Sequence, residues 1–155
     1  MKNNYKNNQN GINTAAIGNK LQQHLAERAK LQRQHDDLWS LIKRGYNRHG
    51  ELKKVDSEIG KNTYAIDGLI GQLIKFRCRS CKAYSMAINY LKSEIARNQR
   101  IISKWLSDID DVQCGRAHWI NSRGAIHYDC TFAFEYVAKK KQKTADVQRL
   151  LSKLL

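Results

Sequence analysis

A heptad spacing of apolar residues between positions 52 and 76 constrains the fold of this chain more than any other feature. Steps that alternate between three and four residues place side chains on one face of an α-helix, where they form a seam against a second helix. One polar residue, Asn62, interrupts the seam, and such a residue either fixes the pairing register or points to water at the seam edge. The seam positions are Leu52, Val55, Ile59, Asn62, Ile66, Leu69, Leu73 and Phe76.

Helical patterns also occur on both sides of this seam. Before it, an apolar stripe from Ile17 to Ile42 is interrupted by polar residues, and residues 45–50 provide a stop. After it, residues 84–109 repeat the spacing with a one-residue offset that falls at 78–82. We therefore predict a turn or kink there, which makes an antiparallel hairpin of the second and third helices with the first helix alongside. One long helix with a stutter is the alternative, since the chain contains no proline.

A different pattern follows residue 111. Residues 117–136 are rich in β-branched and aromatic side chains around the loop 122–124, which predicts a β-hairpin. If Gly124 takes the left-handed third position of a three-residue loop, Trp119 lies opposite His127; a two-residue loop would shift the register by one residue. We prefer the first register because it gathers an apolar face, which consists of Ile120, Ile126, Tyr128, Phe132 and Phe134 together with Cys114, His118 and Cys130.

These patterns predict a mainly α (α+β) protein, in which an antiparallel helical hairpin or coiled-coil-like bundle is followed by a β-hairpin and a short C-terminal helix. We expect a single domain over residues 14–155, with the bundle in 14–111, the β-hairpin in 112–138 and the closing helix in 144–155. Residues 1–13 are mostly Asn, Gln and Lys, so we expect a disordered tail.

Charge narrows the choice of partner. The chain has 28 Lys and Arg against 14 Asp and Glu, a net charge of +14 spread over its whole length. This excess favours a polyanion, DNA or RNA, although a role in solubility alone is the simpler alternative. Two basic windows and a residue at the hairpin tip are the expected phosphate contacts. They are Lys75, Arg77, Arg79 and Lys82; Lys139, Lys140, Lys141 and Lys143; and Arg123.

The first basic window surrounds a Cys-x-x-Cys pair. Two thiolates at this spacing can bind one Zn²⁺, and a structural zinc site needs four ligands. We take Cys78, Cys81, Cys114 and Cys130 as the candidate set, with His118 as a substitute. Buried free cysteines that pack as small apolar groups are the competing interpretation, and a redox pair is a third.

No pattern predicts catalysis. The triplet Asp108, Asp110 and Asp111 fits a solvated helix end better than a metal-dependent nuclease site, so we expect no enzymatic activity. The N-terminus lacks a secretory signal and no apolar run approaches 18 residues, so we expect a cytoplasmic protein without a membrane span. The leading hypothesis is a non-catalytic, regulatory or accessory nucleic-acid-binding protein. The alternative is a coiled-coil adaptor or inhibitor whose seam binds a protein, or a second copy to form a homodimer.

Overall fold

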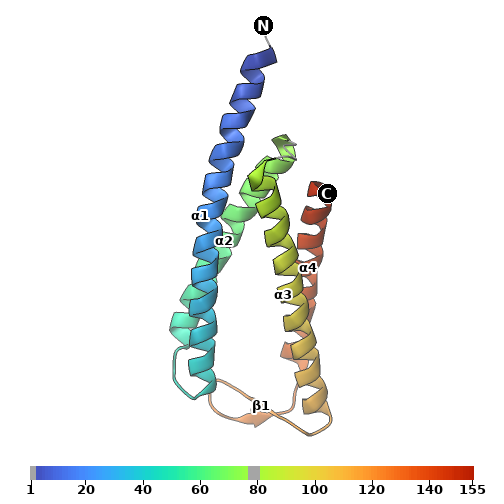
Figure 1. Cartoon of the computed structure of the whole chain (residues 1–155). Coiled ribbons are helices and arrows are strands. Elements are labelled where there is room, and N and C mark those ends of the chain that lie inside the picture. Colours follow the sequence, from blue (N-terminus) through green and yellow to red (C-terminus); the bar gives the residue numbers. More distant parts are fainter. Residues whose placement is uncertain (1–2, 77–80) are drawn as a thin grey trace. The chain divides into compact units, whose positions relative to one another are not determined.

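The computed structural model describes residues 3–76 and 81–155, with side chains from residue 15 onward. The elements in chain order are α1 (Asn3–Lys43), α2 (His49–Phe76), α3 (Lys82–Gln113), β1 (Trp119–Ile120), β2 (Ile126–His127) and α4 (Thr131–Leu154) (Figure 1). The predicted mainly α class, with a β-hairpin before a C-terminal helix, is confirmed. The chain divides into two compact units, Met1–Ile88 and Asn89–Leu155. The single domain expected for residues 14–155 stays a prediction.

In the first unit, α1 and α2 form an antiparallel pair. The Nδ2 of Asn62 donates a hydrogen bond to the carbonyl oxygen of His24 at 2.9 Å. Further along, the Nε2 of His35 lies 3.4 Å from a carboxylate oxygen of Asp56. The α1 partner has a higher number in the second contact than in the first, whereas the α2 partner has a lower one, so the two helices are antiparallel. The central part of the predicted α2 seam is confirmed, since Asn62, Ile66, Leu69 and Leu73 are buried. Ile70 is buried as well, and the outer seam positions Leu52, Val55, Ile59 and Phe76 are half-buried.

The seam of α1 includes polar residues that interrupt its apolar stripe. His24, Arg28 and His35 continue the three and four spacing that begins at Ile17 and Leu21, and all three are half-buried. The guanidinium of Arg28 donates to the carbonyl oxygen of Ile59 at 3.3 Å and to the hydroxyl of Thr63. Polar groups within a seam need such partners, because an unmade hydrogen bond in a buried place is costly.

Asn62 lies inside the seam and not at its edge. Its side chain belongs to a residue that is 6% exposed, and its amide nitrogen reaches across to α1. The Oδ1 atom is buried with no hydrogen-bond partner among the described residues. The interpretation of Asn62 as a side chain that points to water is therefore wrong, and the contact to His24 links α2 to one position along α1.

Two separate helices, and not one helix with a stutter, follow one another around the Cys-x-x-Cys pair. α2 ends at Phe76 and α3 begins at Lys82. Most of the predicted turn at 78–82 lies outside the described residues. Near the start of α3, Gly18 of α1 lies close to Ala83, because a Cβ placed on this glycine would be 3.4 Å from the Ala83 Cβ.

In the second unit, α4 runs back alongside the part of α3 that belongs to this unit (Figure 1). Their contact at the hairpin end is a core in which Ile102, Trp105, Ala117 and Trp119 pack against five buried residues, Ile109, Val112, Cys130, Ala133 and Val137. The helix begins at Thr131, well before the predicted 144. The alternating aromatic residues at 132, 134 and 136 resemble a strand, but Ala133, Val137 and Thr144 form a buried helical stripe, and this packing overrides β propensity.

The β-hairpin has the preferred register and is much shorter than expected. Trp119 pairs with His127, and Ile120 pairs with Ile126. Gly124 has a φ of +80°, as a three-residue loop with a left-handed glycine requires. The strands cover two residues each, so the predicted β-hairpin of 112–138 is wrong in its extent.

The predicted apolar face of this hairpin is also on the wrong side. Ile120, Ile126 and Tyr128 are 65%, 58% and 61% exposed, whereas Trp119 and His127 on the opposite face are half-buried. The buried face follows Trp119 because its large ring packs against Trp105 of α3.

The N-terminal residues differ from the disordered tail expected for 1–13. The structure includes residues 3–13 in α1. A helix that is already formed extends without a new nucleation cost, and no proline stands in the way.

Replacing Asn62 by leucine should raise the free energy of unfolding by about 1 kcal/mol, because the change removes a buried oxygen without a partner and adds apolar contact to the seam. Denaturant unfolding measures the difference. The control is Gln72→Leu on the exposed side of α2, for which a change within about 0.5 kcal/mol is expected. If Asn62→Leu instead lowered the free energy of unfolding, the hydrogen bond from Asn62 to His24 would contribute more to stability than the unpaired oxygen costs, and the prediction would be wrong.

Candidate nucleic-acid interface

The second basic window lies in the middle of α4 and not in a linker. Lys139, Lys141 and Lys143 are exposed, and the Nζ of half-buried Lys140 lies 5.9 Å from the centroid of the Tyr136 ring. Within the described parts of the chain, no ion pair involves Lys139, Lys141 or Lys143. Three neighbouring ammonium groups therefore face solvent without neutralisation.

Helix geometry separates these lysines into two directions. Tyr136, Lys139, Lys140 and Lys143 have the spacing i, i+3, i+4 and i+7, which places them on one face of α4. Lys141 is rotated about 200° from Lys139 and points elsewhere. We call the four-residue set the α4 basic face; it extends about 10 Å along the helix. Its position relative to α3 is set by Tyr136, whose ring centroid lies 4.6 Å from that of Trp105.

The first basic window is described in part. Lys75 lies exposed in the last turn of α2, and Lys82 is the exposed first residue of α3. Arg77 and Arg79 lie outside the described residues. Phosphate binding by this window therefore stays a prediction.

Arg123 lies at the tip of the β-hairpin, in a loop held by Asn121. The side-chain oxygen of Asn121 accepts hydrogen bonds from the backbone N–H groups of Arg123 and Ala125, each at 2.9 Å. Gly124 also donates its N–H to the Asn121 carbonyl oxygen at 2.9 Å. Arg123 is exposed, and its guanidinium has no ion pair within residues 3–76 and 81–155. The loop thus presents a cation on a fixed backbone.

The candidate zinc ligands are in different surroundings. Cys130 is 7% exposed and belongs to the core of the second unit, where the indole N–H of Trp119 points to its sulfur at 3.5 Å. Cys114 is exposed near the end of α3, and Cys81 belongs to the first unit. Cys78 lies outside the described residues, and no three metal-binding side chains gather among the residues that are described. The zinc site stays a prediction; the packing of Cys130 favours the buried-thiol interpretation for that residue.

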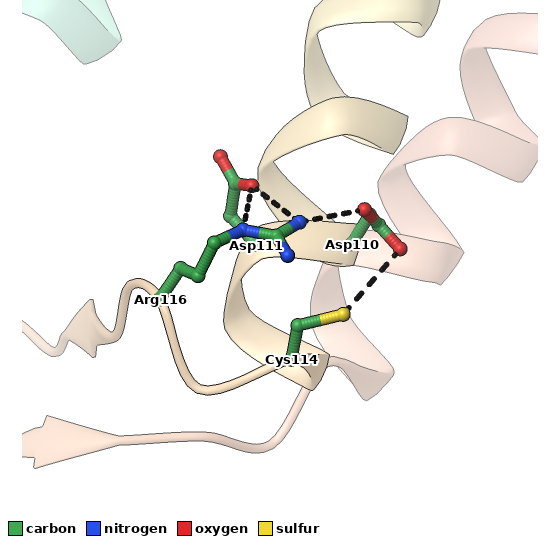
Figure 2. A network of polar contacts seen from close by, with 4 residues as sticks. All are labelled: Asp110, Asp111, Cys114 and Arg116. Carbon is green, nitrogen blue, oxygen red and sulfur yellow. Dashed lines mark hydrogen bonds and ion pairs between the residues drawn. The ribbon is translucent and has the colours of Figure 1, made fainter.

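The acidic triplet takes part in a contact that sequence reasoning missed. Figure 2 shows Arg116 bound to Asp111 through Nε at 3.0 Å and to Asp110 through Nη2 at 2.9 Å. The hydrogen bond that Arg116 donates to the Asp111 carboxylate is the main reason that the pKa of Arg116 is raised above its ordinary value. The Sγ of Cys114 donates a hydrogen bond to the Oδ1 of Asp110 at 3.8 Å. Two carboxylates at the end of α3 are thus held by an arginine from the following loop.

Asp129 accepts hydrogen bonds from the first residue of α4. Its Oδ1 accepts the backbone N–H of Thr131 at 3.0 Å and the Thr131 hydroxyl at 2.7 Å. The hydroxyl contact is the main cause of a pKa below the ordinary value of 3.8. The first N–H groups of a helix lack intrahelical acceptors, so this carboxylate satisfies one of them. The N-cap residue itself, Cys130, makes no side-chain cap.

Comparison of the chain with protein-family models, curated proteins and solved structures found no match. The candidate interface is therefore supported by the charge, exposure and geometry of its own side chains. Within the described residues, no helix combines the length and apolar character needed to cross a membrane.

The contribution of Asp129 to stability should depend on pH in a defined direction. A lowered folded-state pKa means that the carboxylate stabilises the fold above pH 3.8 and that this contribution disappears as the pH falls through the folded-state value. Thermal unfolding of Asp129→Ala should therefore give a midpoint below that of wild type at pH 7, with a smaller difference near pH 2. A difference that is equal at both pH values would contradict the assigned role.

Proposed function

We propose that this protein is a non-catalytic nucleic-acid-binding protein with a regulatory or accessory role, and that the α4 basic face contacts phosphates. The observation that supports this most is the exposure of Lys139 and Lys143 on one helical face without an ion pair in the described structure. A net charge of +14 adds a long-range attraction for polyanions.

Three exposed arginines of the chain differ from these lysines because they form ion pairs within the protein. Arg48 is paired with Glu51 at 2.6 Å, and Arg149 is paired with Asp146. Arg116 binds two aspartates. Lys139 and Lys143, like Arg123, have no such partner in the described structure and retain a charge that a phosphate can neutralise with release of counterions.

The alternative, a protein partner bound through the helical seam, has less support. The central residues of the α2 seam are buried within the first unit, where α1 packs against α2. A partner that used this seam would have to displace α1 and break the contact between Asn62 and His24. Binding of another protein, or of a second copy, through this seam is therefore not our proposal.

The direct test is titration of the purified protein with labelled duplex and single-stranded nucleic acid at two salt concentrations. Micromolar or tighter binding that weakens steeply with salt is expected, because each phosphate contact on duplex DNA adds about −0.9 to the slope of log K against log salt. Failure to bind any nucleic acid at low salt would refute the proposal.

A double variant identifies the surface. Lys139→Gln with Lys143→Gln should reduce the salt slope on a duplex by about 1.8, because two phosphate contacts are lost. The control is Lys53→Gln with Lys54→Gln, which removes the same charge from exposed positions on α2. If both variants weaken binding equally, net charge and not the α4 basic face is responsible.

A further inference from the structure

The β-hairpin has one anchored face and one exposed face. On the anchored face, the Trp119 ring stacks on Trp105 with centroids 5.8 Å apart and meets the edge of Phe132 at 5.1 Å. His127, the cross-strand neighbour of Trp119, lies 5.8 Å from the Phe132 ring. Together with the Trp119 contact to Cys130, these interactions hold the short ribbon against α3 and α4.

The opposite face presents apolar and aromatic groups to solvent. Ile120 and Ile126 are directly paired across the strands and are more than half exposed. His118 lies two residues before Ile120, and Tyr128 lies two residues after Ile126. Both are exposed, and their rings meet edge to face with centroids 6.4 Å apart. We call His118, Ile120, Ile126 and Tyr128 the outer hairpin face. Its exposure has no explanation in the packing of the second unit.

The charges around this face favour an anionic occupant. The four residues of the outer hairpin face include no carboxylate, and Arg123 lies at the adjoining tip. Of the carboxylates nearby in the sequence, Asp110 and Asp111 bind Arg116, and Asp129 accepts hydrogen bonds from Thr131. A polyanion that also carries flat apolar groups therefore fits this surface better than a basic protein does.

We propose that the outer hairpin face binds unstacked bases of a single-stranded nucleic acid. Tyr128 stacks on one base, Ile120 and Ile126 contact the neighbouring base or sugar, and Arg123 binds a flanking phosphate. This inference rests on the proposed function and extends it from phosphate attraction to recognition of exposed bases. The anchored ribbon pre-organises the surface, so little conformational freedom is lost on binding.

Compared with the sequence prediction, the structure changes which aromatic residues are candidates for stacking. Trp119 is engaged with Trp105 and Phe132, whereas Tyr128 is 61% exposed. Tyr136 is 38% exposed, with one face toward Trp105 and Lys140 nearby. Tyr128 is therefore the residue to test.

The experiment compares strands that share phosphates and differ in bases. Fluorescence anisotropy measures the affinity of the 155-residue protein for three labelled ligands: a strand of about 15 thymidines, an abasic strand of equal length, and a duplex. Wild type should bind the thymidine strand about tenfold more tightly than the abasic strand, because only the first offers rings for stacking. Tyr128→Ala with Ile126→Ala should remove this preference and leave the abasic affinity unchanged.

Two further variants separate stacking from general damage. Tyr128→Phe keeps the ring and should retain most of the preference. Tyr64→Ala removes a tyrosine that is 84% exposed on α2 and should bind both strands as wild type does. Circular dichroism and thermal unfolding verify that each variant is folded.

Each outcome has a distinct meaning. Equal wild-type affinity for thymidine and abasic strands would overturn the base-binding inference while the proposed phosphate binding stands. A preference for thymidine that persists in the double variant would also overturn it, because the bases would then contact another surface. Absence of binding to all strands and to the duplex would refute the proposed function itself, and the inference with it.

Discussion

The aromatic contacts of Trp105 hold the second unit together. Its ring stacks on Trp119 of the hairpin, meets Phe132 in the first turn of α4, and contacts Tyr136 one turn later. One side chain of α3 therefore sets both the position of the ribbon and the alignment of α4. Aromatic groups bury large apolar areas and prefer offset or edge-to-face arrangements, so a cluster of four rings combines stability with defined geometry. The α4 basic face and the outer hairpin face both begin next to these contacts.

The first unit is held by a different kind of seam. Its apolar layers alternate with polar ones, in which Arg28 reaches α2 and Asn62 reaches α1. Purely apolar layers would hold the two helices together more strongly. They would also discriminate less among alternative registers, because one apolar residue can take the place of another with little loss of free energy. A hydrogen bond to a single backbone carbonyl is lost if the helices slide. The polar layers thus favour one alignment of a long, simple helix pair.

The sequence predicted those features of the structure that depend on neighbouring residues, and it did not predict those that depend on packing between distant residues. The heptad spacing of α2 identified a helix because periodicity is a local property, and the hairpin register followed from Gly124, whose left-handed backbone requires a three-residue loop. The start of α4 and the buried face of the ribbon could not be read in this way. Both are set by packing on Trp105, which lies 26 residues before Thr131 in the sequence. The sequence alone identifies the lysines at 139–143 as a cluster of charge, but their division into two directions required the knowledge that they are helical.

The positions of the three tryptophans have a spectroscopic consequence. Trp39 lies in the first unit and is 41% exposed, whereas Trp105 and Trp119 are stacked in the second unit with an interplanar angle of 24°. Closely stacked indoles couple their electronic transitions, so the near-ultraviolet circular dichroism of the protein should be dominated by this pair. Emission at the red edge should in turn come mainly from Trp39. The native chain thus contains two optical reporters, one for each unit, which allow the unfolding of each to be followed without an added label.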